Sequence, residues 1–200
     1  RLTDPLAATR AMTALHATEA PTVYLSVHAR VDGVHPEDID RVLFEDRTLV
    51  KQLAMRRTLF VFPRELLPAA LGSAALRVAR EQRRLISRDV EGHRVTTDGR
   101  AWLDVASRAV LDRLAEGGAM SARELREELP ELSGAVVVSP EKKYGGTFPI
   151  APRVLTMLGA QGSIVRGPNA GPWRTPRPTW TRTSSTANSR LAARSHRRTG

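Results

Sequence analysis

The first sixty residues repeat apolar side chains at helical spacing and then change to a run typical of a strand. Asp4 and Pro5 form a helix start, with Asp as the N-cap and proline at the first helical position. The apolar positions predict helices over residues 4–17, 21–31, 35–43 and 46–53, followed by a strand over residues 56–62. Helices followed by a strand pair are typical of a winged helix-turn-helix unit.

Helical spacing returns after Pro63 and continues to Ser87. One face of this predicted helix carries four arginines spaced three, four and four residues apart: Arg77, Arg80, Arg84 and Arg88. Such a stripe either tracks the phosphates of a nucleic acid or is an ordinary solvated face. The polar residues 90–97, which include Gly92, indicate a domain boundary.

A second set of helices and strands follows this boundary. Asp98 caps a long helix, and the capping box of Ser121 and Glu124 begins a short one. The remaining elements are a helix over residues 149–160, a strand at 163–166, a turn at 167–171 and a returning strand at Trp173 and Arg174. Three helices and a hairpin again predict a winged helix. About 18 residues separate the last two helices, whereas a standard helix-turn-helix has about three or four.

These patterns predict a mainly α protein with short β-hairpins, built as tandem winged helix-turn-helix domains with a disordered basic C-terminal tail. The expected divisions are a first winged-helix unit (1–62), connecting helices and a linker (63–97), a second winged-helix unit (98–175) and the tail (176–200). The tail is rich in Pro, Ser, Thr and Ala and has few large apolar residues, too few to offset the entropy cost of ordering. A shifted reading frame or a truncated gene end is an alternative origin for it.

The charge is distributed unevenly along the chain. Lys and Arg number 31 against 21 Asp and Glu, a net charge of +10, and no acidic residue follows Glu141. A basic excess of this size indicates nucleic acid as the first partner to consider. Together with the predicted winged helices, it favours double-stranded DNA. A coding bias toward arginine combined with a disordered basic tail would produce the same numbers.

Other classes of site lack support in the sequence. The chain has no Cys, which excludes disulfides and thiolate-bound metals. Its five histidines form no pair four residues apart and no HExxH motif, so we expect no bound metal. The sequence contains no nucleotide-binding motif, so we expect no cofactor. No apolar run approaches the ~20 residues of a membrane span. We expect a monomeric, cytoplasmic protein without a membrane partner. The chain begins with Arg1 and not with Met, as a clipped fragment would.

Basic and aromatic residues lie where winged helices usually meet DNA. Arg56 and Arg57 begin the first predicted wing, Arg153 lies on the predicted recognition helix, and Arg166 and Arg174 flank the second wing. Another candidate segment carries two cations, a ring that can stack on a base, and two glycines that allow close backbone approach: Lys142, Lys143, Tyr144, Gly145 and Gly146.

A resemblance supports this interpretation. The run LHATEAPTVYLSVHAR from Leu15 to Arg30, the run MRRTL from Met55, the run KKYGG from Lys142 and the final wing are together similar to the AlkZ-like winged-helix DNA glycosylase superfamily, over roughly residues 3–174. The resemblance implies tandem winged helices and excision of alkylated bases from DNA. It also implies a motif of Gln-x-Gln or Gln-x-Asp that holds a water near the anomeric carbon, where this chain has His16-Ala17-Thr18.

His16 and Thr18 are therefore the candidate catalytic residues of a monofunctional DNA glycosylase. A neutral imidazole can accept a proton from water, Thr18 can orient that water, and Glu19 can supply negative charge to a cation-like sugar. Alternatively, His16 merely meets the negative end of a helix dipole, and Thr18 caps the next helix. The alternative functions are a DNA-binding transcription regulator without enzymatic activity and an inactive truncated family member.

Overall fold

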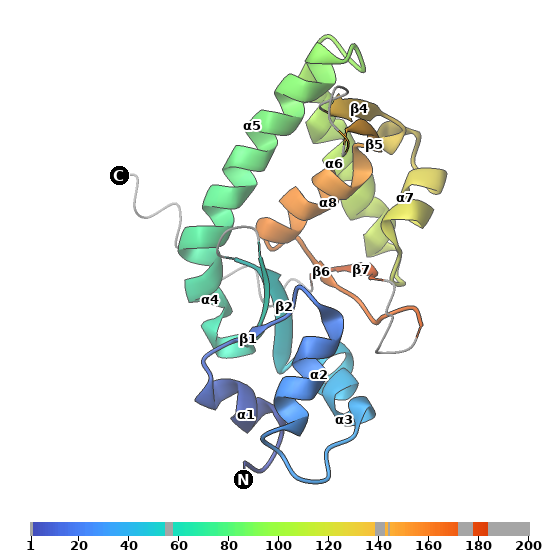
Figure 1. Cartoon of the computed structure of the whole chain (residues 1–200). Helices are drawn as coiled ribbons and strands as arrows, with labels where there is room; N and C mark the ends of the chain where they lie inside the picture. The colour runs from blue at the N-terminus through green and yellow to red at the C-terminus, as the bar shows by residue number, and fades with distance from the viewer. Residues whose placement is uncertain (1, 55–57, 139–142, 144, 172–177, 184–200) are drawn as a thin grey trace.

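The computed structural model describes residues 2–54, 58–138, 143, 145–171 and 178–183 (Figure 1). It is mostly helical with short antiparallel hairpins, which confirms the predicted fold class at that level. Two groups of buried side chains form separate hydrophobic cores, one within residues 8–61 and one within residues 86–180. The structure is therefore described below as a first and a second unit.

The first unit wraps three helices around a small sheet. Its helices are α1 (Pro5–Ala11), α2 (Ala20–His28) and α3 (Pro36–Asp40), the last continued by a π-helical turn (Arg41–Glu45). The sheet contains β1 (Leu15–His16), β2 (Leu49–Leu53) and β3 (Leu59–Pro63) in the antiparallel order β1-β3-β2. The Asp4 side chain accepts a hydrogen bond from the Ala7 amide, as the predicted N-cap requires.

The first predicted helix is too long. It ends at Ala11, and Thr13 then adopts a left-handed backbone conformation with φ of 65°, which a helix cannot contain. The next residues form β1, in which Leu15 is paired with Val61 and His16 with Phe60. The apolar residues of this stretch fit both a helical and an alternating period, and pairing with β3 selects the strand.

The predicted helix over residues 46–53 is wrong, because this segment is strand β2. Arg47 has a left-handed φ of 54° that prevents a helix from starting at Asp46. Leu49 and Val50 are both buried because the two faces of β2 are covered by different parts of the protein. Consecutive buried residues in such a strand resemble one side of a helix when only the sequence is considered.

Helix α5 (Leu76–Gly92) connects the two units and forms much of the left side in Figure 1. A 3₁₀ turn (Arg64–Leu66), helix α4 (Leu67–Ala70) and a π-helical turn (Leu71–Ala75) lead into it. Its Ile86 and Val90 belong to the second core, although the sequence analysis assigned both to the connecting segment (63–97). Helix α6 (Gly99–Ala115) begins at the predicted N-cap Asp98. A side chain on Gly99 would collide with the carbonyl group of Ser87, so this glycine allows the close approach of α5 and α6.

The rest of the second unit contains two hairpins. Helix α7 (Ala122–Glu128) begins with the predicted capping box and is followed by a 3₁₀ turn (Pro130–Leu132). Strands β4 (Ala135–Val138) and β5 (Gly146–Pro149) then form a hairpin that occupies most of the long separation before α8 (Ala151–Ala160). The sequence analysis did not predict this hairpin.

The second hairpin closes with a strand from the predicted tail. Strand β6 (Ile164–Arg166) pairs with β7 (Trp180–Arg182), whereas the predicted returning strand at Trp173 and Arg174 lies outside the described residues. The expectation that residues 176–200 lack structure is wrong at residues 178–183. Trp180 is buried and lies against Gly159 of α8, where a Cβ would come within 2.8 Å of its ring. The large ring therefore completes the second core.

Direct hydrogen bonds join the two units. The Gln52 side chain in β2 donates to the carbonyl oxygen of Gly159 at 2.9 Å, and Arg47 Nη1 donates to the carbonyl oxygen of Arg166 at 2.7 Å. Strand β2 is thus shared between the sheet of the first unit and the contact with α8 and β6. Among the described residues, none of the helices is both long and apolar enough to span a membrane.

Candidate functional site

His16 lies on β1, an edge strand of the first sheet, with its side chain exposed. The residue opposite it in β3 is Phe60, and the two rings meet edge to face with centroids 5.6 Å apart. The interpretation that His16 sits in the last turn of a helix is wrong, because α1 ends at Ala11. The imidazole is instead oriented by an aromatic neighbour on a strand.

Thr18 is exposed on the same side of the chain as His16. Leu15 and Ala17 are buried in the first core, while His16 and Thr18 are exposed, which is the alternation of a strand with one covered face. The Ala17 amide donates to the carbonyl oxygen of Leu59 at 2.9 Å and extends the pairing with β3. Thr18 does not cap α2, because the N-cap is Glu19, whose side chain makes no capping hydrogen bond.

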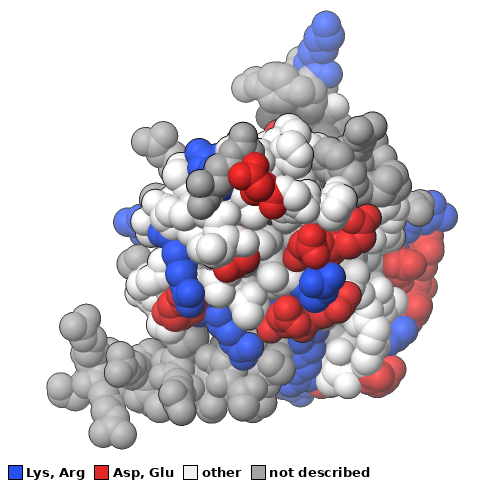
Figure 2. Space-filling view, turned by 90° about the horizontal axis from the view of Figure 1, so that it is seen from below, with Lys and Arg blue, Asp and Glu red and all other residues white. Residues whose placement is uncertain are grey.

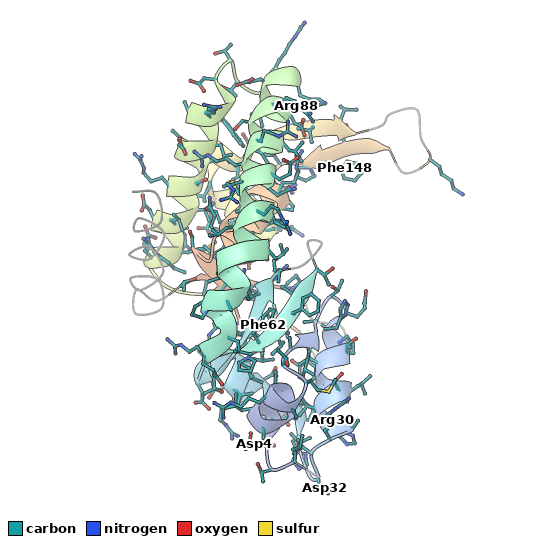
Figure 3. The ribbon with its side chains drawn as sticks, turned by 90° about the vertical axis from the view of Figure 1, so that its left-hand side faces the viewer. Asp4, Arg30, Asp32, Phe62, Arg88 and Phe148 are labelled. Atoms are coloured by element: carbon teal, nitrogen blue, oxygen red, sulfur yellow. The ribbon has the colours of Figure 1, made fainter. Side chains whose placement is uncertain are left out.

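The sheet face that carries His16 contacts the second unit. Phe60 is opposite His16 on one side and Gln52 on the other, so the three side chains share a face. Gln52 reaches α8 from that face through its bond to Gly159. Phe62, labelled in Figure 3, continues the same face with its ring 6.0 Å from that of Phe60. His16 and Thr18 therefore lie beside the contact between the units.

The first predicted wing is the β2–β3 hairpin, and the loop end of this hairpin lies at the same end of the sheet as Thr18. The last described bond of the hairpin runs from the Ala54 amide to the carbonyl oxygen of Thr58, at 3.0 Å. The pairing of β1 with β3 reaches Leu59, one residue away. Arg56 and Arg57 lie outside the described residues.

The β4–β5 hairpin projects from the second unit, as the position of Phe148 in Figure 3 shows. Phe148 in β5 and Val137 in β4 are exposed apolar side chains, at 45% and 43% of their full exposure. Lys143, between the strands, is also exposed, whereas Lys142 and Tyr144 lie outside the described residues. The described part of the hairpin thus presents apolar and cationic groups to solvent.

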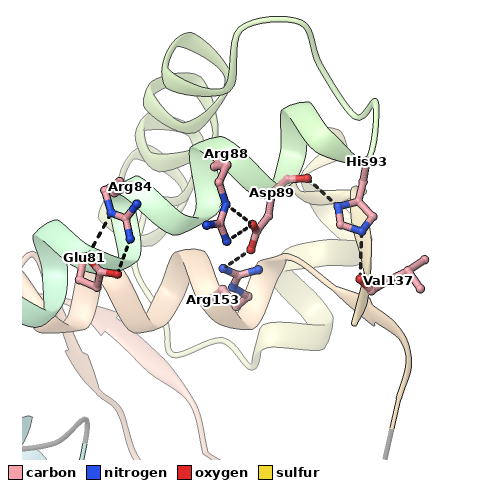
Figure 4. A network of polar contacts seen from close by, with 7 residues as sticks. All are labelled: Glu81, Arg84, Arg88, Asp89, His93, Val137 and Arg153. Atoms are coloured by element: carbon pink, nitrogen blue, oxygen red, sulfur yellow. Dashed lines mark hydrogen bonds and ion pairs between the residues drawn. The ribbon is translucent and has the colours of Figure 1, made fainter. Parts of the chain in front are cut away.

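Arg153 is held in an ion pair on the surface of the second unit. Its Nη2 lies 2.9 Å from Oδ2 of Asp89 on α5, and the same carboxylate accepts from Nε and Nη2 of Arg88 at 3.1 and 2.9 Å (Figure 4). Partial burial alone would raise the pKa of Asp89, but the hydrogen bonds from Arg88 and Arg153 outweigh burial, and the pKa is lowered. Arg153 therefore neutralises an acid of α5.

The four arginines of the predicted stripe on α5 differ in their partners. Arg84 donates to Glu81 at 2.8 and 3.2 Å, and Arg88 is paired with Asp89. Arg77 and Arg80 are exposed and have no acidic partner within the part of the chain that the structure describes. Only half of the stripe therefore carries cations that are not already paired.

A family model described as "DNA glycosylase AlkZ-like" matches residues 9–199. The chain belongs to the DNA glycosylase AlkZ-like family. The match covers both units and confirms the resemblance found in the sequence. No curated protein and no solved structure matches the chain significantly. Membership of the AlkZ-like family gives this protein a function related to DNA repair, with DNA as its partner.

Arg166 of this AlkZ-like protein is packed where the two units meet. Its guanidinium lies 3.9 Å from the centre of the Trp180 ring, and burial lowers its pKa to about 10. Its Nε is buried without a hydrogen-bond partner among the described residues. Arg174, the other predicted residue of the second wing, lies outside the described residues.

Lys51 of β2 was not predicted from the sequence as a residue of the site. Its side chain is only 7% exposed and lies beside the contact between the two units. Its ammonium lies 5.2 Å from the ring centre of Phe44 and 6.0 Å from that of Tyr24. Burial lowers its pKa to about 8, and nearby Asp40 only partly opposes that change. The pattern Leu-Val-Lys-Gln-Leu gives no signal for a buried lysine, because only strand pairing shows that both faces are covered. Among the described residues, no group of three His, Asp or Glu side chains is placed to bind a metal ion.

Proposed function

We propose that this AlkZ-like protein binds double-stranded DNA as a monomer with two winged-helix units, and hydrolyses the N-glycosidic bond of an alkylated base. His16 and Thr18 are the residues assigned to the reacting sugar. The observation that carries the proposal is their shared exposure, His16 on edge strand β1 and Thr18 just beyond it, while the residue between them is buried. They occupy the positions that the resemblance assigns to the two polar residues of the family motif.

The chemistry needs a water and groups that orient it. His16 accepts a proton from water through a ring nitrogen, Thr18 accepts a hydrogen bond from the same water, and the oxygen attacks C1′ as the bond to the base breaks. A purine alkylated at N3 or N7 carries positive charge, so it leaves as a neutral base without being protonated first. Glu19, exposed and adjacent, adds negative charge near the cation-like sugar.

A nucleobase within a duplex must leave the stack before water can reach its sugar. The two hairpins support this role, because the loop end of the β2–β3 hairpin lies near Thr18, and the β4–β5 hairpin carries exposed Phe148 and Lys143. The end of the first unit away from these hairpins shows intermixed acidic and basic side chains (Figure 2). A surface of mixed sign gives little attraction to a polyanion, so we place the DNA against the hairpins.

The geometry counts against the alternative of a transcription regulator. A base-reading helix presents polar side chains to the major groove. The predicted recognition helix is α8, of which seven residues from Ala151 to Ala160 are buried. Its Arg153 is bound to Asp89, and the Thr156 hydroxyl donates to the carbonyl oxygen of Pro152. Few groups of α8 remain to distinguish one DNA sequence from another.

The test is to incubate the protein with duplexes that carry an N3- or N7-alkylpurine and to measure abasic sites. We expect excision by the wild type and its loss in His16→Ala and Thr18→Ala, with DNA binding retained. His28→Ala is the matched control, because His28 is an exposed histidine on α2. Binding without excision, together with selection of one sequence from a random pool, would contradict the proposal and support the regulator.

A further inference from the structure

His93 follows the C-terminal end of α5 and contacts two backbone carbonyl groups. Its Nδ1 lies 2.8 Å from the carbonyl oxygen of Asp89, one turn back along the helix. Its Nε2 lies 2.9 Å from the carbonyl oxygen of Val137 in β4 (Figure 4). The ring therefore connects the end of the long helix to the β4–β5 hairpin.

The two contacts determine the protonation state that fits them. A carbonyl oxygen only accepts hydrogen bonds, so each ring nitrogen must carry a proton to bond with its partner. A neutral imidazole carries one proton and would direct a lone pair at the second carbonyl oxygen. Both contacts are hydrogen bonds only in the doubly protonated, positively charged ring. The C-terminal end of a helix also favours a positive charge.

The charged groups around His93 come from α5 and α8. The Asp89 carboxylate is bound by Arg88 and by Arg153 of α8, and the Glu91 carboxylate accepts from the Gly99 amide at 2.7 Å. Strand β4 contains only Ala135 and three valines, so it brings no titratable side chain to the ring. The nearby acids are thus already engaged, and the two carbonyl groups are the partners of the imidazole.

The attachment matters because the hairpin is only partly covered by the rest of the second unit. Val137 and Phe148 are both exposed on it, and Val137 is the residue whose carbonyl group His93 binds. Fixing a projecting element in one orientation reduces the entropy that it loses when it binds a partner. A charged bond at this point therefore prepares the hairpin for binding.

We propose that His93 is a positioning residue that, through both of its ring nitrogens, fixes the β4–β5 hairpin to α5 and strengthens duplex binding by that hairpin. The part concerning DNA rests on the proposed function, because it requires the hairpin to contact the duplex. The part concerning the hairpin's attachment is independent of DNA.

The first measurement tests the attachment alone. The chain has no Cys, so Thr147→Cys in β5, at an exposed position, accepts a single spin label. We expect the label to be more mobile in His93→Gln than in the wild type, because the substitution removes the ring that joins the two carbonyl groups. His28→Gln should behave as the wild type. Nitrogen chemical shifts of the His93 ring should show two N–H groups.

The second measurement tests the consequence for DNA. We expect the wild type to bind an unmodified duplex about tenfold more tightly than His93→Gln, the size of one hydrogen bond to a charged group. His28→Gln controls for any general effect of a lost histidine.

The outcomes separate the two proposals. A label whose mobility is the same in the wild type and in His93→Gln overturns the attachment, as does a ring that shows one N–H group. If the label responds as expected but the wild type binds no duplex, the attachment stands and the proposed function fails. If DNA binds equally well with and without His93, the positioning role is overturned.

Discussion

The side-chain amide of Gln52 donates a hydrogen bond to the carbonyl oxygen of Gly159, 107 positions later in the chain. Gln52 is 4% exposed, and it belongs to the same face of the first sheet as His16. This bond holds the end of α8 over the sheet that carries the candidate catalytic residues. The orientation of the two units is therefore set by backbone groups as well as by apolar packing.

We expect Gln52→Ala to lower the free energy of unfolding by about 0.5–1.5 kcal/mol, because it removes a buried hydrogen bond between the units. The carbonyl oxygen of Gly159 keeps its hydrogen bond from the Gly162 amide. Denaturant unfolding measures the change. Gln161→Ala is the matched control, since Gln161 lies one residue beyond α8 and its side chain forms no hydrogen bond within the described residues. An equal effect of both substitutions would show that the bond across the units is not important.

The buried ammonium of Lys51 predicts an unusual dependence of stability on pH. Its pKa is about 8 in the folded protein and 10.5 when exposed. Between these values the unfolded chain binds more protons, so the free energy of unfolding rises with pH, by up to about 3 kcal/mol. Above pH 10 two effects oppose each other: the raised pKa of Tyr24 lowers stability as pH rises, and the lowered pKa of Arg166 increases it.

Unfolding measured from pH 7 to 10 should therefore show stability that rises with pH. Lys51→Met should remove the rise, because it removes the titrating group. Lys143→Met is the control, since Lys143 is exposed. A rise that persists in Lys51→Met would assign it to another group and contradict the role of burial at β2.

Gly99→Ala should destabilise the protein by more than about 2 kcal/mol, because the new Cβ would collide with the carbonyl group of Ser87 and push α6 from α5. Gly92→Ala provides a matched control. Its added Cβ meets no atom within 4 Å, and alanine favours a helix by about 1 kcal/mol over glycine. Thermal unfolding of both variants gives the comparison, and equal effects would be inconsistent with the close helix contact.

The partners of the arginines on α5 predict which of them contribute to DNA binding. Arg77→Gln and Arg80→Gln should each weaken duplex binding and reduce the slope of log affinity against log salt by about 0.9, if each contacts one phosphate. Arg84→Gln should have a smaller effect, because Arg84 already pairs with Glu81. Binding titrations from low to moderate salt measure both quantities. Equal slopes in all three variants and the wild type would exclude this face from the interface.

The sequence predicted elements whose signals are local. The caps at Asp4, Asp98 and Ser121 all form the expected hydrogen bonds, because capping depends on residues within one turn. Strand β2 was mistaken for a helix because Leu49, Val50 and Leu53 fit both periods. Thr13 and Arg47 have left-handed backbone conformations that a helix cannot contain. Because neither residue is a glycine, the sequence does not indicate these conformations.

Features that depend on pairing between distant segments could not be predicted from local sequence patterns. The resemblance located His16 and Thr18, but their common exposure follows from pairing with β3, more than forty residues away. Strand β7 was missed because Arg, Pro, Ser and Thr dominate the residues around it, and only its partner β6 reveals the role of Trp180. Lys51 was missed for the same reason, since its burial requires both the sheet and the second unit.

The late position of Trp180 affects how the chain acquires its structure during synthesis. All three strands of the first unit have been made once Pro63 has left the ribosome, and that unit can fold while translation continues. The second core stays open beside Gly159 until about 120 more residues have emerged, since its closing ring is supplied by β7. Nascent chains stalled before residue 180 should therefore expose the apolar side of α8 to chaperones, and chains released after residue 182 should not.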